Sequence, residues 1–318
     1  MLSQCIFSVK TPVGPPVEII RHTFSPSQSA KPAKRVSLVA GLHGDELEGL
    51  YICHRLMETL KNLEEQNAFK GEVHIYPAVN PQALETGTRL WPFFSIDINR
   101  TFGEKNMPSL VTEASQTLLE DLKFNSDLVV DFHASNLHLM ELPQIRIIKD
   151  FEKKLVPLAK LCNVDLVWVH PHAEIFESTL GYNLNRAKIP TLVIESGICL
   201  RIHKNYCEQI ILGILNLLRQ TGVIDSGEPL AEVTPPRLVQ PDYVAMIQAR
   251  NAGLFVKQAE VGQMLKEGDK IGDLIGPDQV REEIRSPCSG LLFTLREHPL
   301  TGKGAPLARI ATEKPFKP

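Results

Sequence analysis

The chain has 318 residues, of which 43% are hydrophobic and 22% are charged, and its formal net charge is −3. Such a chain can bury a large core and is expected to form more than one domain. It has no long basic or acidic block and no run of about 18 apolar residues, so we expect neither electrostatic nucleic-acid binding nor a membrane-spanning helix. The first residues lack the features of a signal peptide, and the six cysteines form no CxxC pair. These features predict a cytoplasmic protein without a disulfide scaffold.

Apolar strands and amphipathic helices are expected to alternate through residues 1–222. One or two strands are expected before residue 35, and further strands at residues 36–40, 73–81, 127–133, 145–148, 164–170 and 191–197. Helices are expected at about residues 45–62, 110–122, 153–162 and 205–220. This alternation predicts an α/β domain in which helices cover both faces of a mostly parallel, mixed sheet.

The sequence changes character after residue 222. Residues 223–240 are rich in proline and are expected to form a linker, whereas residues 241–318 predict a small all-β, barrel-sandwich-like domain. The segments AGLF, VGQMLKEGDKIGDLIG and IRSPCSG in this domain resemble the biotinyl/lipoyl hammerhead. A carrier domain needs a lysine at its hairpin tip, but Asp278 and Gln279 stand where Asp-Lys would be expected. We therefore expect no attached cofactor there.

The candidate chemistry begins at the end of the apolar run 36–40, where the sequence reads VSLVAGLHGDELEG. His43 and Glu46 lie three residues apart, and His133 lies at the end of a second expected strand. Two histidines and a glutamate with an open fourth position form a common catalytic zinc site. Taken singly, these residues could also be a surface histidine, a carboxylate in the first turn of a helix and a core histidine. Other divalent ions could occupy the same ligands.

Three further carboxylates lie at expected strand or loop positions. Glu195 ends the apolar strand 191–197, where an ionised group without a task would be costly, so we expect it to act as a general base. A helix cap or an ion pair is its structural alternative. Asp97 and Asp131 are candidates for hydrogen bonds to the ligating imidazoles, and Asp131 shares a strand face with His133. A plain hydrogen bond to a nearby loop is the alternative for Asp131.

The expected loop that follows the strand at residues 73–81 carries Arg89, Asn99 and Arg100. Arg89 is a candidate for stabilising a tetrahedral oxyanion together with the metal ion. The planar guanidinium of Arg100, with Asn99, suits a substrate carboxylate. Each arginine by itself could equally be a solvated surface charge.

At this point the sequence resembles the succinylglutamate desuccinylase/aspartoacylase family, whose members are related to the zinc carboxypeptidases. The segments HGDELEG, NPQALETGTR, DINRTF, DFH and PTLVIESG resemble the family's motifs and occur in the family's order over about residues 36–197. The resemblance implies a zinc-carboxypeptidase-like fold and one zinc ion per chain. It also implies that His43, Glu46 and His133 ligate the zinc ion and that Arg89 stabilises the oxyanion. Asn99 and Arg100 would bind the substrate carboxylate, and Glu195 would act as the general base. Arg186 and Tyr182, which precede the strand at residues 191–197, are further candidates for the substrate pocket.

The resemblance therefore implies hydrolysis of the amide bond of a small N-acyl amino acid, or a similar carboxylate-bearing amide, by zinc-activated water. A metallocarboxypeptidase that acts on short peptides is the nearer alternative, and a non-catalytic zinc-binding interaction protein is the more distant one. The expected partner is a small-molecule substrate. The sequence leaves open the acyl group, the amine product and whether the chain forms a homo-oligomer.

Overall fold

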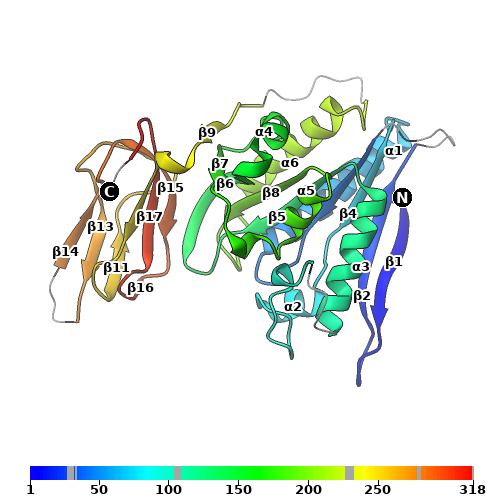
Figure 1. Ribbon diagram of the computed structural model, residues 1–318, viewed down its shortest axis with the longest axis horizontal. Helices are drawn as coiled ribbons and strands as arrows, with labels where there is room; N and C mark the ends of the chain where they lie inside the picture. The colour runs from blue at the N-terminus through cyan, green and yellow to red at the C-terminus, as the bar shows by residue number, and fades with distance from the viewer. Residues whose placement is uncertain (27–31, 33, 104–108, 226–232, 278–280, 317–318) are drawn as a thin grey trace.

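The structure is a computed structural model that describes residues 1–26, 32, 34–103, 109–225, 233–277 and 281–316 (Figure 1). The strands of its first part are β1 (Leu2–Val9), β2 (Val17–Phe24), β3 (Arg35–Val39), β4 (Glu72–Tyr76), β5 (Leu128–Ala134), β6 (Leu139–Ile148), β7 (Leu166–His170) and β8 (Thr191–Gly197). Its helices are α1 (Leu47–Glu65), α2 (Pro81–Thr86), α3 (Leu110–Asn125), α4 (Glu152–Ala159), α5 (Leu180–Arg186) and α6 (Lys204–Gln220), with short 3₁₀ turns η1 (Ile98–Arg100), η2 (Lys149–Phe151) and η3 (Glu174–Phe176).

The centre of the main sheet is parallel and its flanks are antiparallel. Strands β4, β3, β5 and β8 lie side by side in parallel, while the β1–β2 hairpin pairs antiparallel to β4 on one side and β6 pairs antiparallel to β8 on the other. Parallel neighbours require crossover connections, and the helices between the strands supply them. The predicted mostly parallel, mixed sheet is confirmed.

Helices cover both faces of this sheet. Alternate residues of β5 divide between two apolar cores: Val130 and Phe132 pack in the core that contains α1 and α6, and Val129 packs in the core that contains α3 and α5. A strand that is buried on both faces has apolar residues at nearly every position. The sequence around residues 128–134 has this pattern and therefore predicts a strand. Among the described residues, no helix is long and apolar enough to cross a membrane.

Two short helices, α2 and α5, lie in segments where the sequence pattern does not predict a helix. The side chain of Asn80 accepts a hydrogen bond from the backbone N–H of Ala83 at the start of α2, and Thr179 caps α5 in the same way through Tyr182. Each helix is under three turns long, so it carries too little periodic pattern to be recognised and depends on its cap and its packing.

The C-terminal part, which we call the C-terminal module (residues 233–316 as described), is all β, as predicted. Its strands are β9 (Arg237–Val239), β10 (Val244–Gln248), β11 (Gly253–Lys257), β12 (Met264–Leu265), β13 (Lys270–Ile275), β14 (Arg281–Arg285), β15 (Gly290–Arg296), β16 (Leu300–Thr301) and β17 (Pro306–Thr312), with a 3₁₀ turn η4 (Pro241–Tyr243). A separate antiparallel sheet has the order β14-β13-β11-β16. The expected hairpin tip with Asp278 and Gln279 lies outside the described residues.

The C-terminal module is joined to the first part through strand pairing. Strand β15 pairs antiparallel with β6, so that β15, β17 and β10 continue the main sheet, and β9, within the expected linker, pairs parallel with β7. The module lies at one end of the molecule and the β1–β2 hairpin at the other (Figure 1). This continuity places β17 within reach of the residues at the start of β6.

Gly44 controls how closely the turn after β3 approaches α2. A side chain at this position would collide with the backbone of Ala83. We therefore expect Gly44→Ala to lower the free energy of unfolding by about 1–3 kcal/mol, because the backbone must shift to relieve the overlap. Chemical denaturation measures this loss. Gly302→Ala is the control, because a Cβ there would meet no atom within 4 Å, and an equal loss in both variants would contradict the prediction.

Candidate active site

The candidate residues gather at the carboxyl ends of the parallel strands, where ligands bind in open α/β sheets. His43 and Glu46 lie between β3 and α1, and His133 lies in β5. Glu195, in β8, is the direct neighbour of His133 across the parallel pairing of the two strands. Sheet register thus brings together residues that are more than 60 positions apart in the sequence.

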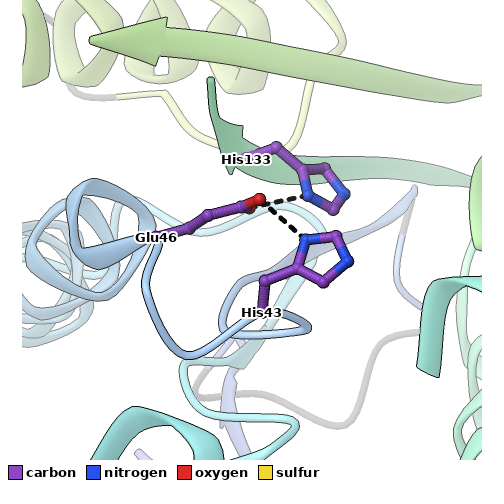
Figure 2. Close-up of side chains that lie close together, drawn as sticks. All are labelled: His43, Glu46 and His133. Atoms are coloured by element: carbon purple, nitrogen blue, oxygen red, sulfur yellow. Dashed lines mark hydrogen bonds and ion pairs between the residues drawn. The ribbon is translucent and has the colours of Figure 1, made fainter. Parts of the chain in front are cut away.

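His43, Glu46 and His133 form a buried cluster (Figure 2). One carboxylate oxygen of Glu46 lies 2.7 Å from Nδ1 of His43, and the other lies 2.8 Å from Nδ1 of His133. Glu46 occupies the N-cap position of α1, but its side chain makes no capping hydrogen bond. The carboxylate faces the two imidazoles instead, so α1 begins without a side-chain cap.

A second carboxylate lies behind each imidazole. Nε2 of His43 is 2.9 Å from an oxygen of Asp97, and Nε2 of His133 is 3.0 Å from an oxygen of Asp131. In each ring the Nε2 atom is therefore bound by an aspartate, and the Nδ1 atom faces Glu46. Carboxylate–imidazole pairs of this kind fix the orientation and tautomer of histidines that ligate metals.

The cluster has the donor set and the electrostatics of a cation site. One ligand atom from each of the three side chains lies within 4.8 Å of the others. Burial acts to raise the pKa of the Glu46 carboxyl, but the imidazoles of His43 and His133 outweigh it and lower the pKa below its usual range. Two imidazole nitrogens and an ionised carboxylate that converge in a buried space are a donor set suited to a divalent ion.

Arg89 lies beside the cluster. Its guanidinium donates to Glu46 at 3.3 Å and to Asp97 at 3.1 Å, while 39% of its side chain remains exposed. Asp97 also accepts a hydrogen bond from the backbone N–H of Asn99, which orients the η1 turn. One aspartate thus connects the orientation of an imidazole, an arginine and the following turn.

Glu195 faces the same space from β8. Its carboxylate lies 3.2 Å from the guanidinium of Arg146, a residue of β6. Burial raises the pKa of the Glu195 carboxyl above its ordinary value, although the adjacent Arg146 acts to lower it. A carboxylate with a raised pKa is a stronger base than an exposed one.

The η1 turn presents Asn99 and Arg100. The side-chain oxygen of Asn99 accepts a hydrogen bond from the backbone N–H of Leu180 at 2.9 Å, which ties the turn to α5. The Arg100 guanidinium donates to the backbone carbonyl of Asn99 at 2.7 Å, and the residue is exposed. Asn99 therefore has a structural contact in addition to its expected contact with substrate.

A cavity of about 410 Å³ connects these groups. The lining includes the His–Glu–His cluster and the general base candidate Glu195. It also includes apolar side chains, namely Ile147, Phe151, Leu155, Phe176 and Val193. Tyr182 lines the cavity, as the sequence suggested. Arg186 is exposed, lies over the Tyr182 ring at 5.8 Å and is not among the lining residues, so its expected substrate contact gains no support.

Three charged residues that line this cavity are not predicted from the sequence: Glu141, Arg146 and Arg309. Arg146 is expected only as part of an apolar strand, and no residue of the C-terminal module is expected in the site. An arginine within the run IRII is a signal that could have been used, because a charge in a buried strand needs a partner.

Residues 32–221 match the model of the succinylglutamate desuccinylase/aspartoacylase catalytic domain. The match covers more than half of the chain and includes the His–Glu–His cluster, Arg89 and Glu195. The chain therefore belongs to the succinylglutamate desuccinylase/aspartoacylase family, hydrolases that act on the amide bonds of N-acyl amino acids. The resemblance noted in the sequence is confirmed.

Individual relatives are distant in sequence but extend over nearly the whole chain. N-alpha-acetyl-L-2,4-diaminobutyric acid deacetylase from Halomonas elongata is 23% identical over 283 residues, which cover 86% of this chain and 81% of that protein. The product-bound structure of the ectoine utilization protein EutE (DoeB) from Ruegeria pomeroyi is 19% identical, with a TM-score of 0.78 and coverage of 94% of this chain and 90% of that one. A succinylglutamate desuccinylase/aspartoacylase from Rhodobacter sphaeroides is 21% identical, with a TM-score of 0.78 and coverage of 99% and 96%. The solved structures thus share the fold of both the catalytic part and the C-terminal module.

Proposed function

We propose that this protein is a zinc-dependent deacylase that hydrolyses the amide bond of a small N-acyl amino acid. The observation that carries the proposal is the buried His–Glu–His cluster, backed by two aspartates, in one cavity with Glu195 and the two arginines, Arg89 and Arg100. Each group needed for hydrolysis of a carboxylate-bearing amide is therefore present within one small space.

His43, Glu46 and His133 would hold one zinc ion. The Nδ1 atoms of the two histidines are the expected ligand atoms, since Asp97 and Asp131 engage the Nε2 atoms. When bound, zinc would act as a Lewis acid and lower the pKa of a water molecule in the site. The protein side chains account for the remaining requirements, which are proton transfer, charge stabilisation and substrate orientation.

Glu195 is the proposed general base. Its carboxylate takes a proton from the attacking water and then delivers it to the nitrogen of the leaving amine. Its burial favours both steps, because a raised pKa allows the carboxyl group to accept the proton and to hold it until the amine leaves.

Arg89 is the proposed partner of the developing oxyanion. Its guanidinium lines the cavity, is held in place by Glu46 and Asp97, and keeps part of its surface accessible. A fixed cation at this point stabilises negative charge that forms on the carbonyl oxygen and needs little reorganisation during the reaction.

Arg100, with Asn99, is the proposed binding site for the substrate carboxylate. Both residues line the cavity, and the planar guanidinium can donate two hydrogen bonds to a carboxylate. The cavity volume suits a small molecule. The Halomonas elongata relative is named as a deacetylase of an N-acetylated amino acid, which supports the same substrate class here.

The proposal is tested with a panel of N-acyl amino acids, their α-carboxamides and short peptides. We expect the free acids to be hydrolysed best, and we expect Arg100→Ala to raise their KM about tenfold to a hundredfold, because a charged hydrogen bond is lost. The carboxamides should have a similarly high KM in the original enzyme and should be nearly insensitive to Arg100→Ala. Faster hydrolysis of short peptides than of N-acyl amino acids would contradict the proposal and favour a metallocarboxypeptidase.

A further inference from the structure

Glu141, in β6, is a fully buried carboxylate whose two oxygens bind different parts of the molecule. Oε2 accepts from Arg146 at 2.6 Å and from Gln144 at 2.9 Å, both within β6. Oε1 accepts from Arg309 at 2.6 Å and from Thr294 at 3.3 Å, both in the C-terminal module. One carboxylate therefore forms a junction between the first part of the structure, which contains β1–β8 and α1–α6, and the C-terminal module.

The two arginines that Glu141 binds also share an aromatic surface. The guanidinium carbons of Arg146 and Arg309 lie 5.8 Å and 5.4 Å from the ring centre of Trp168, a buried residue of β7. Phe293, from β15 of the module, packs edge-on against the same ring at 5.3 Å. A carboxylate between two guanidiniums, with an indole beneath both, restricts the orientation of each arginine.

The junction extends to the proposed general base. Arg146 uses one terminal nitrogen for Glu141 and the other for Glu195, which lies 3.2 Å away. Glu141, Arg146, Arg309 and Glu195 all line the cavity. A continuous series of ion pairs therefore runs from the C-terminal module, through one buried carboxylate, to the residue that would move the proton.

We propose that the contact of Arg309 with Glu141 positions Arg146 against Glu195, so that the C-terminal module is required for turnover. Arg309 and Glu141 are positioning residues that act through Arg146, and this inference rests on the proposed role of Glu195. The module fixes the orientation of the general base. This orientation matters because displacement of a catalytic group by a small distance strongly lowers the reaction rate.

The test compares Arg309→Met, Arg309→Lys and the control Thr294→Val in the full-length, zinc-loaded protein. Arg309→Met removes the ion pair that positions Arg146, whereas Thr294→Val removes only a weaker hydrogen bond to the same carboxylate. We expect Arg309→Met to lower kcat by about tenfold to a hundredfold, with KM changed less than about threefold. Arg309→Lys should recover most of kcat, and Thr294→Val should remain close to the original enzyme.

Chemical rescue gives a second measurement. Added guanidinium ion should restore part of the kcat of an Arg309→Ala variant, because it can occupy the space between Glu141 and Trp168. It should not alter the activity of Thr294→Val or of the original enzyme.

If Arg309→Met does not fold, the charge-balanced variant Glu141→Gln, Arg309→Met replaces it, since this variant leaves no unpaired carboxylate at the junction.

Three results would overturn the inference. A raised KM with unchanged kcat would mean that Arg309 contacts the substrate directly. Unchanged kinetics with a lowered melting temperature would mean that the junction only stabilises the fold. Loss of kcat without recovery in Arg309→Lys or with guanidinium would mean that the positive charge of Arg309 is not what positions Arg146. If Glu195→Gln retains activity, the proposed function itself fails, whatever the Arg309 variants do.

Discussion

Replacement of Glu195 by Gln is expected to lower kcat by about a hundredfold to ten-thousandfold while zinc remains bound. The amide of Gln keeps the size of the side chain and can still contact Arg146, but it cannot accept a proton from water. Glu195 is not part of the His–Glu–His cluster, so the metal content of the variant should equal that of the original protein. Steady-state kinetics on an N-acyl amino acid and elemental analysis of the same preparation measure both quantities.

Glu208→Gln is the matched control for this variant. Glu208 pairs with Arg55 at 3.0 Å, both residues are partly exposed, and neither lines the cavity. Its substitution should leave kcat unchanged. Near-normal turnover in Glu195→Gln would remove the general base assignment. A zinc-loaded original protein that hydrolyses no amide or ester in a broad panel would instead favour a non-catalytic zinc-binding protein.

The double variant His43→Ala, His133→Ala is expected to lose its metal and its activity together. The original protein should contain about one zinc per chain, and the double variant should contain almost none, because two of three ligands are missing. Glu46 and Asp131 would then be buried carboxylates without their imidazole partners, so we also expect a lower melting temperature. Elemental analysis and thermal denaturation measure these effects.

His172→Ala is the control for the metal measurement. His172 pairs with Asp150 and Glu177 near the protein surface and is not part of the cluster, so its variant should keep the zinc. Equal metal content in the double variant and the original protein would mean that the ion binds elsewhere. No metal in the original protein, even after reconstitution with zinc, would remove the ligand assignment and with it the proposed deacylase. A different divalent ion at one per chain would keep the ligands and change only the metal.

Much of the fold can be predicted because its strands are buried on both faces and its long helices are amphipathic. The strand that carries Asp131 and His133 and the strand that carries Glu195 were both predicted within one residue of their ends. Their apolar runs are continuous because both sheet faces are covered. The helices α2 and α5 were not predicted, since a helix of six or seven residues has too little periodic pattern and depends on tertiary packing.

The sequence also identified the residues of the candidate site, although their roles remain predictions. His43, Glu46 and His133 were grouped from residue type and from their positions at strand ends, and the structure brings them together. Asp97 and Asp131 were named as partners of the imidazoles, and each lies at hydrogen-bond distance from one of them. In a parallel sheet the strands end at a common edge, so residues at strand ends can be expected to meet even when they are distant in sequence.

Only the tertiary structure decided that Glu141 and Arg309 line the same cavity. Glu141 and Arg309 are 168 residues apart, and they meet because β15 pairs antiparallel with β6 and brings β17 alongside. No local pattern encodes that pairing, because strand register between distant segments is set by the packing of whole sheet faces. The sequence by itself therefore determined the chemical groups at the strand ends and the family they indicate. The folded sheet determined that a residue of the C-terminal module lies in the same cavity.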